Sequence, residues 1–421
     1  MIILILNCLT IFVLLVLSIF SLRRFLFALT AVFTRIDCET IIPEAFRPFV
    51  TILVPCHNEE TVIAETLDAL LKMDYPRDKL EIVVIDDLSS DHTLKIAQRY
   101  EKEYSHIHAF QRSKSALARG KAAAMNEALT KFTKGEIVYF VDADHRVRPD
   151  ALIRLVGHFS NREIGAVSGR CRPWNKYDAI ISSYVYLESL IHHRVTMYAS
   201  DKLGLAPCIL GSNFCIRRAL LDRIGRFNEK SLTEDMDLTA SVYEHSYIVK
   251  YDVTSISEHE APHNVRSYML QHLRWNRGFN QTVRTHWRRI LRDKSMPLPR
   301  RIEETLVSLG YLDRLFFITG FVLTLLSLFI MPSYRFPYWV WPIFLGLPLF
   351  QILIALILER ERMNIYLRLP LILSMFSVDI LVSLTALYQD ITQKPTRWYK
   401  TLRIGDRATT EKEDLITQGR K

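Results

Sequence analysis

The seven residues Val138-Tyr-Phe-Val-Asp-Ala-Asp144 carry four apolar or aromatic side chains, followed by two aspartates that one alanine separates. The apolar part is short, continuous and partly β-branched, and it follows Lys134-Gly135, so it predicts a buried strand. Alternate residues of a strand share a face, and we expect Asp142 and Asp144 to point the same way where the strand ends. Adjacent carboxylates repel each other unless a cation lies beside them, and oxygen ligands suit Mg²⁺ or Mn²⁺, which usually arrive with a substrate diphosphate. The alternative is a solvated loop after a core strand.

The composition indicates a globular domain held between membrane segments. The chain has 421 residues, too many for one ordinary core, and its 49% hydrophobic and 24% charged residues are unevenly distributed. Long uncharged runs lie at both ends, with ordinary polar sequence between them. The net charge of +9 does not indicate a nucleic-acid partner, because the basic residues cluster beside the apolar runs, where cytoplasmic lipid surfaces attract them. For any single basic residue, a solvated surface position is the alternative.

The cysteines indicate a reduced, cytoplasm-facing domain without a structural zinc site. None of the six forms a CxxC pair, and none is spaced with histidine as a zinc site requires. We expect scattered thiols, most of them small core residues, at Cys8, Cys38, Cys56, Cys171, Cys208 and Cys215.

The amino-terminal run predicts a membrane-spanning helix. Ile2 to Phe20 carry no charge and are long enough to cross a bilayer. Arg23 and Arg24 follow at once, so this end is expected on the cytoplasmic side. A cleaved signal peptide fits less well, because the start is not basic and no clear small-residue cleavage site follows. Phe25 to Phe33 are expected to continue along the membrane surface as an amphipathic turn.

The middle of the chain begins with three repeats of a strand and a helix. The strands are expected at Phe49–Pro55, Glu81–Asp87 and Ile137–Val141. A helix carrying Val62, Leu67, Leu70 and Leu71 follows the first strand, one through Ala97 and Tyr100 follows the second, and one over Lys121–Phe132 precedes the third. This alternation predicts an α/β fold of Rossmann-like type, with a mostly parallel sheet covered on both faces. Ligands of such sheets bind beyond the carboxyl ends of the strands, where five acids occur: Glu59, Asp86, Asp87, Asp142 and Asp144.

The following part is more mixed. We expect a strand at Gly165–Gly169, a helical stretch over Tyr184–Tyr198 and a loop entering a strand over Pro207–Ile216. Thr233-Glu-Asp235 opens a helix that runs through Tyr243. After Val265 the sequence becomes basic and aromatic, which suits a helix lying on the cytoplasmic lipid surface.

The carboxy-terminal part carries three more apolar segments. They cover about Leu315–Met331, Tyr338–Leu358 and Leu369–Tyr388, and the third contains Asp379, which is costly in lipid unless it faces protein or a water-filled path. One amino-terminal span plus three crossings would place the basic tail Lys394–Arg403 outside the cell. Either one segment is re-entrant or interfacial, or the charge rule fails there.

Six short motifs, taken together and in order, point to one family. The set resembles the family-2 inverting glycosyltransferases, and most closely the membrane-embedded synthases of poly-N-acetylglucosamine, cellulose, hyaluronan and chitin oligosaccharides. The resemblance covers about residues 48–290 and implies a GT-A type domain that uses a nucleotide sugar, most often a UDP-sugar. The motifs are Val54-Pro-Cys-His-Asn-Glu-Glu60, Ile85-Asp-Asp-Leu-Ser-Ser-Asp91, Arg119-Gly-Lys-Ala122, Asp142-Ala-Asp144, Thr233-Glu-Asp235 and Gln271-His-Leu-Arg-Trp275.

The resemblance also implies an organisation of the chain. We expect an amino-terminal membrane segment over 1–33 and a GT-A glycosyltransferase domain over 48–262. Interfacial helices with the Gln-x-x-Arg-Trp motif follow over 263–300, and transmembrane segments over 303–390. A polar tail covers 391–421.

The resemblance assigns the metal and the base. It implies that Asp144 holds a divalent ion, Mg²⁺ or Mn²⁺, with Asp142 nearby and facing the sugar and ribose. Asp235, the last residue of Thr233-Glu-Asp235, matches the general base for the acceptor hydroxyl. The alternative is that this motif only caps the helix that it opens, and the two roles are compatible.

The nucleotide contacts follow in the same way. Asp87 matches the family's uracil-contacting acid, while Glu59 and the backbone after Pro55 would line the uridine. Lys121 matches a lysine near the nucleotide, although a surface lysine at a helix start is the alternative. One departure occurs at Leu88, where the family usually has glycine, whose turn angles leucine resists.

The Gln-x-x-Arg-Trp motif is expected to bind the diphosphate and the acceptor sugar, together with Glu234. Gln271, Arg274 and Trp275 stand at spacings i, i+3 and i+4, so they share one face of a helix. Arg274 suits phosphate oxygens and Trp275 suits stacking on a sugar ring. The alternative, aromatic and arginine side chains at a membrane interface, accounts for Trp287 and the arginines after it.

The sequence therefore predicts a multi-pass enzyme of the cytoplasmic membrane with a cytoplasmic catalytic domain. It is expected to transfer a sugar, N-acetylglucosamine by resemblance, from a UDP-sugar to a growing β-linked polysaccharide. Its expected partners are the donor, a glycan or lipid acceptor, membrane lipids and a small accessory membrane subunit, with no nucleic acid. Two alternatives stay open: a synthase that adds one sugar to a diacylglycerol, ceramide or polyprenyl acceptor, and a catalytically silent subunit of an envelope complex.

Overall fold

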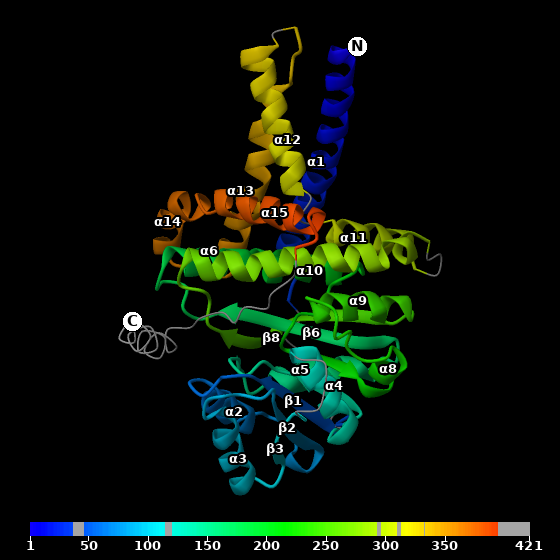
Figure 1. Ribbon diagram of the computed structural model, residues 1–421, viewed down its shortest axis with the longest axis vertical. Coiled ribbons are helices and arrows are strands. Elements are labelled where there is room, and N and C mark those ends of the chain that lie inside the picture. Colours follow the sequence, from blue (N-terminus) through cyan, green and yellow to red (C-terminus); the bar gives the residue numbers. More distant parts are fainter. Residues whose placement is uncertain (37–45, 114–119, 293–295, 310–312, 332, 395–421) are drawn as a thin grey trace.

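An α/β domain, a layer of crossing helices and a bundle of long apolar helices follow one another along the longest axis of the protein (Figure 1). The computed structural model describes residues 1–36, 46–113, 120–292, 296–309, 313–331 and 333–394. Cys38, Arg119 and nearly all of the predicted polar tail lie outside these ranges. The five cysteines within them are free thiols, as expected.

The α/β domain is built on one eight-stranded sheet in the order β3-β2-β1-β4-β7-β6-β8-β5. Its first four strands are parallel, and β7 runs antiparallel to both β4 and β6. The predicted α/β class is confirmed, and so are the three predicted strands, which became β1, β2 and β4. Strand β3 was not predicted; it is an edge strand in which only alternate residues are buried. The strands are β1 Val50–Cys56, β2 Leu80–Asp86, β3 Ile107–Gln111, β4 Ile137–Phe140, β5 Arg146–Val147, β6 Ile164–Pro173, β7 Phe214–Arg217 and β8 Ile248–His259.

Both faces of the sheet are covered by helices. Ile52 and Val54 of β1 point into one core with α2, α3 and α5, whereas Leu53 points into the opposite core with α4, α8 and α9. Since successive side chains of a strand alternate between faces, continuous apolar strands are needed to fill both cores. The helices are α2 Ile63–Leu71, α3 Thr93–Glu103, α4 Lys121–Lys131, α5 Ala151–Gly157, α8 Arg218–Arg223 and α9 Glu234–Glu244.

A second layer of helices lies across the domain. The 28-residue helix α10 Val265–Arg292 is the predicted basic and aromatic helix, and it packs against α9 on one side and α15 on the other. The predicted helical stretch over Tyr184–Tyr198 begins earlier, as α6 Ile180–Ile191, and continues through a π-helical turn into α7 Tyr198–Lys202. Helix α11 Leu298–Ser308 follows α10.

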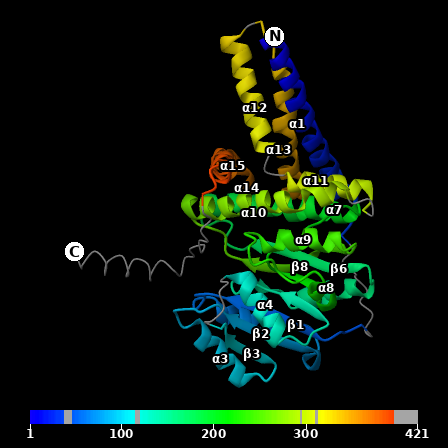
Figure 2. The same ribbon diagram turned by 45° about the vertical axis from the view of Figure 1, so that its right-hand side comes forward.

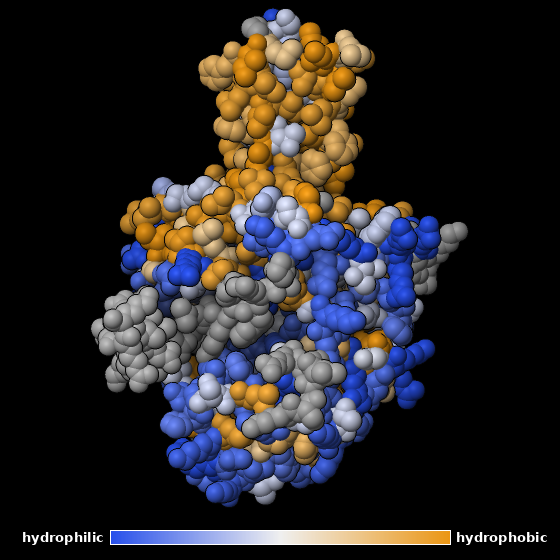
Figure 3. Space-filling model, viewed as in Figure 1, coloured by the Kyte–Doolittle hydropathy of each residue, from blue (hydrophilic) through white to orange (hydrophobic). Residues whose placement is uncertain are grey.

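Among the described residues, three helices are long and apolar enough to cross a membrane. They are α1 Ile2–Phe33, α12 Asp313–Leu325 with its continuation to Ile330, and α13 Trp341–Leu358 with the turn that begins at Tyr338. They rise together from one end of the protein and form its apolar surface (Figure 3). The expected surface turn at Phe25–Phe33 is wrong: these residues continue α1, because Phe27, Ala28 and Ala31 are buried in a core shared with α6 and α13.

The last apolar segment is not one straight helix. It forms α14 Met363–Leu373 and α15 Phe376–Ile391, which bend by 46° at their junction. The pair lies beside the three-helix bundle at the level of α10, rather than running along the bundle (Figure 2). Near its end, Asp390 accepts a hydrogen bond from Arg277 of α10 at 2.9 Å, so this end lies against the crossing layer.

Candidate active site

The loops at the carboxyl ends of β1 and β2 brace each other. The backbone N–H of Asn58 donates to Ser89 Oγ at 2.9 Å, and that of Glu59 donates to Thr93 Oγ1 at 2.7 Å. Asp86 is fully buried and accepts the backbone N–H of Ser89 at 3.1 Å, which gives it a structural part in this loop. The predicted uridine-lining loop is therefore held from both strands.

Asp87 lies at the adjoining edge of the sheet. Its Oδ1 pairs with Arg112 Nε at 2.5 Å, and its Oδ2 accepts the backbone N–H of Gly120 at 3.0 Å. Leu88 adopts a φ of 58°, in the left-handed region that favours glycine. The leucine therefore bears a backbone strain that a glycine at this position would avoid. Gly120 has a φ of 100° and directly precedes α4. Lys121, the first residue of α4, therefore follows the residue whose backbone N–H binds Asp87.

Asp142, Asp144 and His145 form an acidic group just beyond β4. One ligand atom from each lies within 4.8 Å of the others. Ser212 Oγ accepts the backbone N–H of Asp142 at 2.9 Å, and the ring of His145 is fixed by a hydrogen bond between Nδ1 and Ser257 Oγ. His145 was not predicted; its position directly after the two acids, and the frequency of histidine as a metal ligand, are signals that could have found it.

Lys121 joins this group to α9. Its Nζ lies 2.6 Å from Asp142 Oδ1 and 3.5 Å from Glu234 Oε1, and it donates to the carbonyl oxygen of Gly211 at 2.6 Å. Burial acts to lower the pKa of Lys121, but the carboxylates of Asp142 and Glu234 outweigh burial and raise that pKa above its ordinary value. The lysine is therefore a positive charge held between two acids at the start of α4.

Asp235 lies in the first turn of α9, beside the same group. A methyl carbon added at Gly211 would lie 3.4 Å from Asp235 Oδ2 and 3.8 Å from Lys121 Nζ, so both polar atoms border one point. Burial, followed by the negative charge of Glu234, raises the pKa of Asp235 to about 6. Thr233 stands at the cap position of α9, but its side chain makes no capping hydrogen bond within the described part of the chain.

Helix α10 borders the site on the side of the apolar helices (Figure 1). Its Arg274 donates to the carbonyl oxygen of Leu232 at 3.5 Å, and its positive charge acts to lower the pKa of Asp235. Gly278, one turn further, allows Thr233 to pack against the α10 backbone. The absence of a side chain at Gly278 thus sets how closely the helix carrying Asp235 approaches the helix carrying Arg274.

The structure brings most of the predicted site residues together. Lys121 links Asp142 to Glu234, and Asp235 and Arg274 adjoin this cluster. Pro55 stands opposite Ile85 in the β1–β2 ladder, at the same edge of the sheet. The remaining predicted residues lie on neighbouring elements: Glu59 and Asp87 on the loops after β1 and β2, and Gln271 and Trp275 on α10, the helix that carries Arg274.

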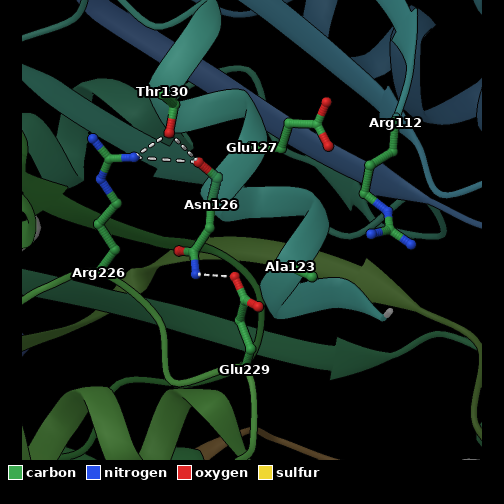
Figure 4. Close-up of a pocket in the computed structure, with 7 residues that line it drawn as sticks. All are labelled: Arg112, Ala123, Asn126, Glu127, Thr130, Arg226 and Glu229. Atoms are coloured by element: carbon green, nitrogen blue, oxygen red, sulfur yellow. Dashed lines mark hydrogen bonds between the residues drawn. The ribbon is translucent and has the colours of Figure 1, made fainter. Parts of the chain in front are cut away.

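A hollow lies elsewhere, beside α4 (Figure 4). It has a volume of about 340 Å³, and its polar side chains bond to one another, as in the hydrogen bond from Asn126 Nδ2 to Glu229 Oε1 at 2.9 Å. None of the predicted site residues lines this hollow, which is bordered by Arg112, Ala123, Asn126, Glu127, Thr130, Arg226 and Glu229.

The acidic group fits a divalent cation. Two carboxylates and one imidazole supply hard oxygen ligands and one nitrogen, a donor set that suits Mn²⁺ and also Mg²⁺. The ring of His145 is oriented by the hydrogen bond between its Nδ1 and Ser257 Oγ, and metal-ligating histidines are usually oriented in this way.

Comparisons with known proteins agree with this geometry. Residues 47–278, more than half of the chain, match the family described as glycosyltransferase like family 2. A mannosyltransferase from Pyrobaculum calidifontis, solved with GDP-mannose and Mn²⁺, shares the fold with a TM-score of 0.65 at 22% identity, over 93% of this chain and 100% of that one.

Curated relatives match over part of their length. The chain is 32% identical to a probable glycosyltransferase, YdaM, of Bacillus subtilis over 56% of each protein. It is 31% identical to a beta-monoglucosyldiacylglycerol synthase of Trichormus variabilis, over 59% of this chain and 52% of that protein. It is 26% identical to a poly-beta-1,6-N-acetyl-D-glucosamine synthase of Staphylococcus epidermidis over 62% of each. The alignments thus span between half and two thirds of these relatives, and within that span the chain belongs to the glycosyltransferase-like family 2.

Proposed function

We propose that this protein is a membrane-bound, metal-dependent, inverting glycosyltransferase that takes its sugar from a UDP-sugar. The observation that carries the proposal is the position of the Asp235 carboxylate, whose Oδ2 borders the same point beside Gly211 as Lys121 Nζ. Burial and the charge of Glu234 raise the pKa of Asp235 to about 6, so this carboxylate is ionised at neutral pH and can still take up a proton. It lies beside Lys121, which bridges Asp142 and Glu234. A base, a fixed cation and a pair of acids within one cluster are the groups that transfer from a sugar diphosphate requires.

The residues divide the reaction between them. Asp235 takes the proton of the acceptor hydroxyl as its oxygen bonds to the anomeric carbon. The bond from that carbon to the phosphate oxygen breaks, and its electron pair leaves with the nucleoside diphosphate. Attack opposite the leaving group inverts the anomeric configuration. Lys121 and Arg274 supply positive charge for the departing diphosphate.

Asp142, Asp144 and His145 would hold the divalent ion. When bound, such an ion neutralises charge on the leaving diphosphate. Asp87 and the loop after Pro55 would bind the uridine, since Arg112 and Gly120 fix the carboxylate of Asp87 at the sheet edge.

The contacts of the apolar helices support a cytoplasmic catalytic domain. Arg23 and Arg24 near the inner end of α1 pair with Glu303 and Asp313, which flank the start of α12. The turn after α13 also meets the catalytic domain, because Glu359 accepts a hydrogen bond from Arg170 at 2.8 Å. If α1, α12 and α13 cross the membrane and α14–α15 lie at its surface, then Arg23, Arg24 and the turn after α13 lie on the same side as the catalytic domain. This arrangement agrees with the tendency of basic residues to lie on the cytoplasmic side.

Two acceptors are compatible with this arrangement. A growing β-linked polymer of N-acetylglucosamine is supported by the Staphylococcus epidermidis relative. A lipid acceptor that receives one sugar is supported by the Trichormus variabilis relative, which has the higher identity, and by the position of α10 directly against the interfacial helix α15. We propose an acceptor hydroxyl presented at the membrane surface in either case.

The first test is a donor screen on the purified full-length protein in lipid nanodiscs. UDP-N-acetylglucosamine, UDP-glucose and GDP-mannose are each supplied with Mg²⁺ or Mn²⁺, and the released nucleoside diphosphate is measured. Asp235→Asn should lower the rate by about 10²–10⁴-fold, the usual contribution of a general base. Asp222→Asn, the same substitution on the surface helix α8, is the matched control and should leave the rate unchanged. Equal rates for the two variants would refute Asp235 as the base, and no turnover with any donor would favour a silent subunit.

The second test separates the acceptors by product length. Radiolabelled donor is added to nanodiscs that contain dioleoylglycerol, and the products are extracted and sized. A single added sugar in the lipid phase would exclude the polymer, and a ladder of water-soluble glycans would exclude single addition.

A further inference from the structure

Asp379 is a buried carboxylate in the first turn of the largely apolar helix α15. Only 4% of its surface is exposed, and three donors from three other helices reach it. Tyr184 Oη of α6 donates at 2.9 Å, Arg314 Nη2 of α12 donates at 2.9 Å, and the hydroxyl of Tyr268 of α10 donates to the second oxygen. A charge in this setting is costly and is kept only when paired, so a function that repays the cost is expected.

A chain of aromatic rings runs from Asp379 to the acceptor motif. The ring of Tyr268 stacks on His272 with centroids 3.9 Å apart, and His272 meets Trp275 at 4.7 Å. His272 is held from the other side by Glu188 of α6, whose Oε2 lies 3.4 Å from Nε2. Tyr268 is fully buried, so this stack has little freedom to shift. Trp275 is thus two ring contacts away from the carboxylate.

A second acid joins the same two helices without reaching this stack. Asp390, at the other end of α15, accepts hydrogen bonds from Arg277 at 2.9 Å and from Asn280 at 2.7 Å. Its side chain is 6% exposed, close to the 4% of Asp379. Both acids fasten α15 to α10, but only Asp379 bonds to a member of the Tyr268–His272–Trp275 stack.

We propose that Asp379 is a positioning residue for the acceptor: it anchors Tyr268 and, through His272, sets the orientation of Trp275. The proposal rests on the proposed function and on the expectation, from the Gln-x-x-Arg-Trp motif, that Trp275 of α10 stacks on the acceptor sugar. Asp379 lies on α15 and accepts a hydrogen bond from Arg314 in the first turn of α12. The acceptor tryptophan is thus oriented by the apolar helices, whereas the donor-binding groups are oriented by the sheet. Loss of Asp379 should therefore weaken acceptor use and spare the donor.

The test compares Asp379→Asn with Asp390→Asn in nanodiscs. The acceptor probes are dioleoylglycerol and a short β-linked N-acetylglucosamine oligosaccharide, used with whichever donor the wild type turns over. Asp379→Asn should raise the acceptor KM by about tenfold or more and leave the donor KM within about twofold, because only the acceptor contact is displaced. Asp390→Asn should leave both KM values within about twofold. Equal acceptor KM values in the two variants would refute the proposal, even where the wild type transfers sugar.

A second readout does not depend on turnover. The emission of Trp275 is isolated by subtracting spectra of Trp275→Phe in each background, and its quenching by acrylamide is measured. Quenching should increase in Asp379→Asn and stay at the wild-type level in Asp390→Asn. Tyr268→Phe, which keeps the ring and removes only the hydroxyl, should move quenching in the same direction by less, and it replaces Asp379→Asn if that variant fails to fold. Unchanged quenching in both Asp379→Asn and Tyr268→Phe would overturn the proposal, and a wild type without transferase activity would overturn the proposed function instead.

Discussion

Gly278→Ala should separate α9 from α10 and disable the site while leaving the fold intact. A methyl carbon at position 278 would lie 2.6 Å from Thr233 Oγ1 and 2.9 Å from Thr233 Cβ, and closer still to Cγ2. Relaxed carbon–carbon contacts require about 3.5–4.0 Å, so the start of α9 must move away by about 1 Å. Asp235 is two residues beyond Thr233 and moves with it. A misplacement of about 1 Å costs on the order of 10²-fold in rate.

The stability cost has two opposing parts. Overpacking of a filled contact costs about 1–3 kcal/mol. Alanine in place of glycine inside a helix stabilises the folded state by about 0.5–1 kcal/mol. The expected net loss in the free energy of unfolding is therefore about 0–2.5 kcal/mol, too little to unfold a domain that buries two cores.

The assay measures nucleoside diphosphate release and thermal unfolding for three variants. Gly346→Ala in α13 is the matched control, because a methyl group there meets nothing within 4 Å, and it should match the wild type in rate. Thr233→Ala in the Gly278→Ala background removes Cγ2 and Oγ1, and it should recover part of the lost rate. If Gly278→Ala retains the activity of Gly346→Ala, the close approach of α9 to α10 does not set the geometry of Asp235.

Three further outcomes follow from named contacts. Because Asp235 acts only when ionised and its pKa is raised to about 6, kcat/KM should fall about tenfold for each pH unit below 6, and a flat profile down to pH 5 would exclude Asp235 as the base. Leu88→Gly relieves a left-handed backbone at a φ of 58° and should raise the free energy of unfolding by about 0.5–1 kcal/mol in chemical denaturation; destabilisation would contradict the strain. His145→Ala should raise the Mn²⁺ concentration for half-maximal activity by about 10–100-fold, the range seen when metal-site residues are lost, whereas an unchanged metal titration would remove His145 from the site.

Strands β1, β2 and β4 could be predicted because their signals are local. The continuous apolar runs of β1, β2 and β4 fill a core on each face, and such runs are visible in the sequence. The edge strand β3 was missed because an edge strand buries only alternate residues and resembles a polar loop. Leucine at position 88 put the geometry of this turn in doubt, because leucine resists left-handed backbone angles. In the structure Leu88 nevertheless adopts a φ of 58°, and the hydrogen bond from the Asn58 N–H to Ser89 Oγ holds the turn in place.

By itself, the sequence determined the order of the motifs and the acids at the ends of the strands. It also determined the apolar helices α1, α12 and α13. Each of these features depends on residues close together in the chain. Only the tertiary structure decided that Lys121 bridges Asp142 and Glu234, that Gly278 sets the approach of α9, and that α15 lies against α10. The reason is that these contacts join segments remote in sequence. Their distances follow from how the sheet and helices pack, and no local pattern encodes them.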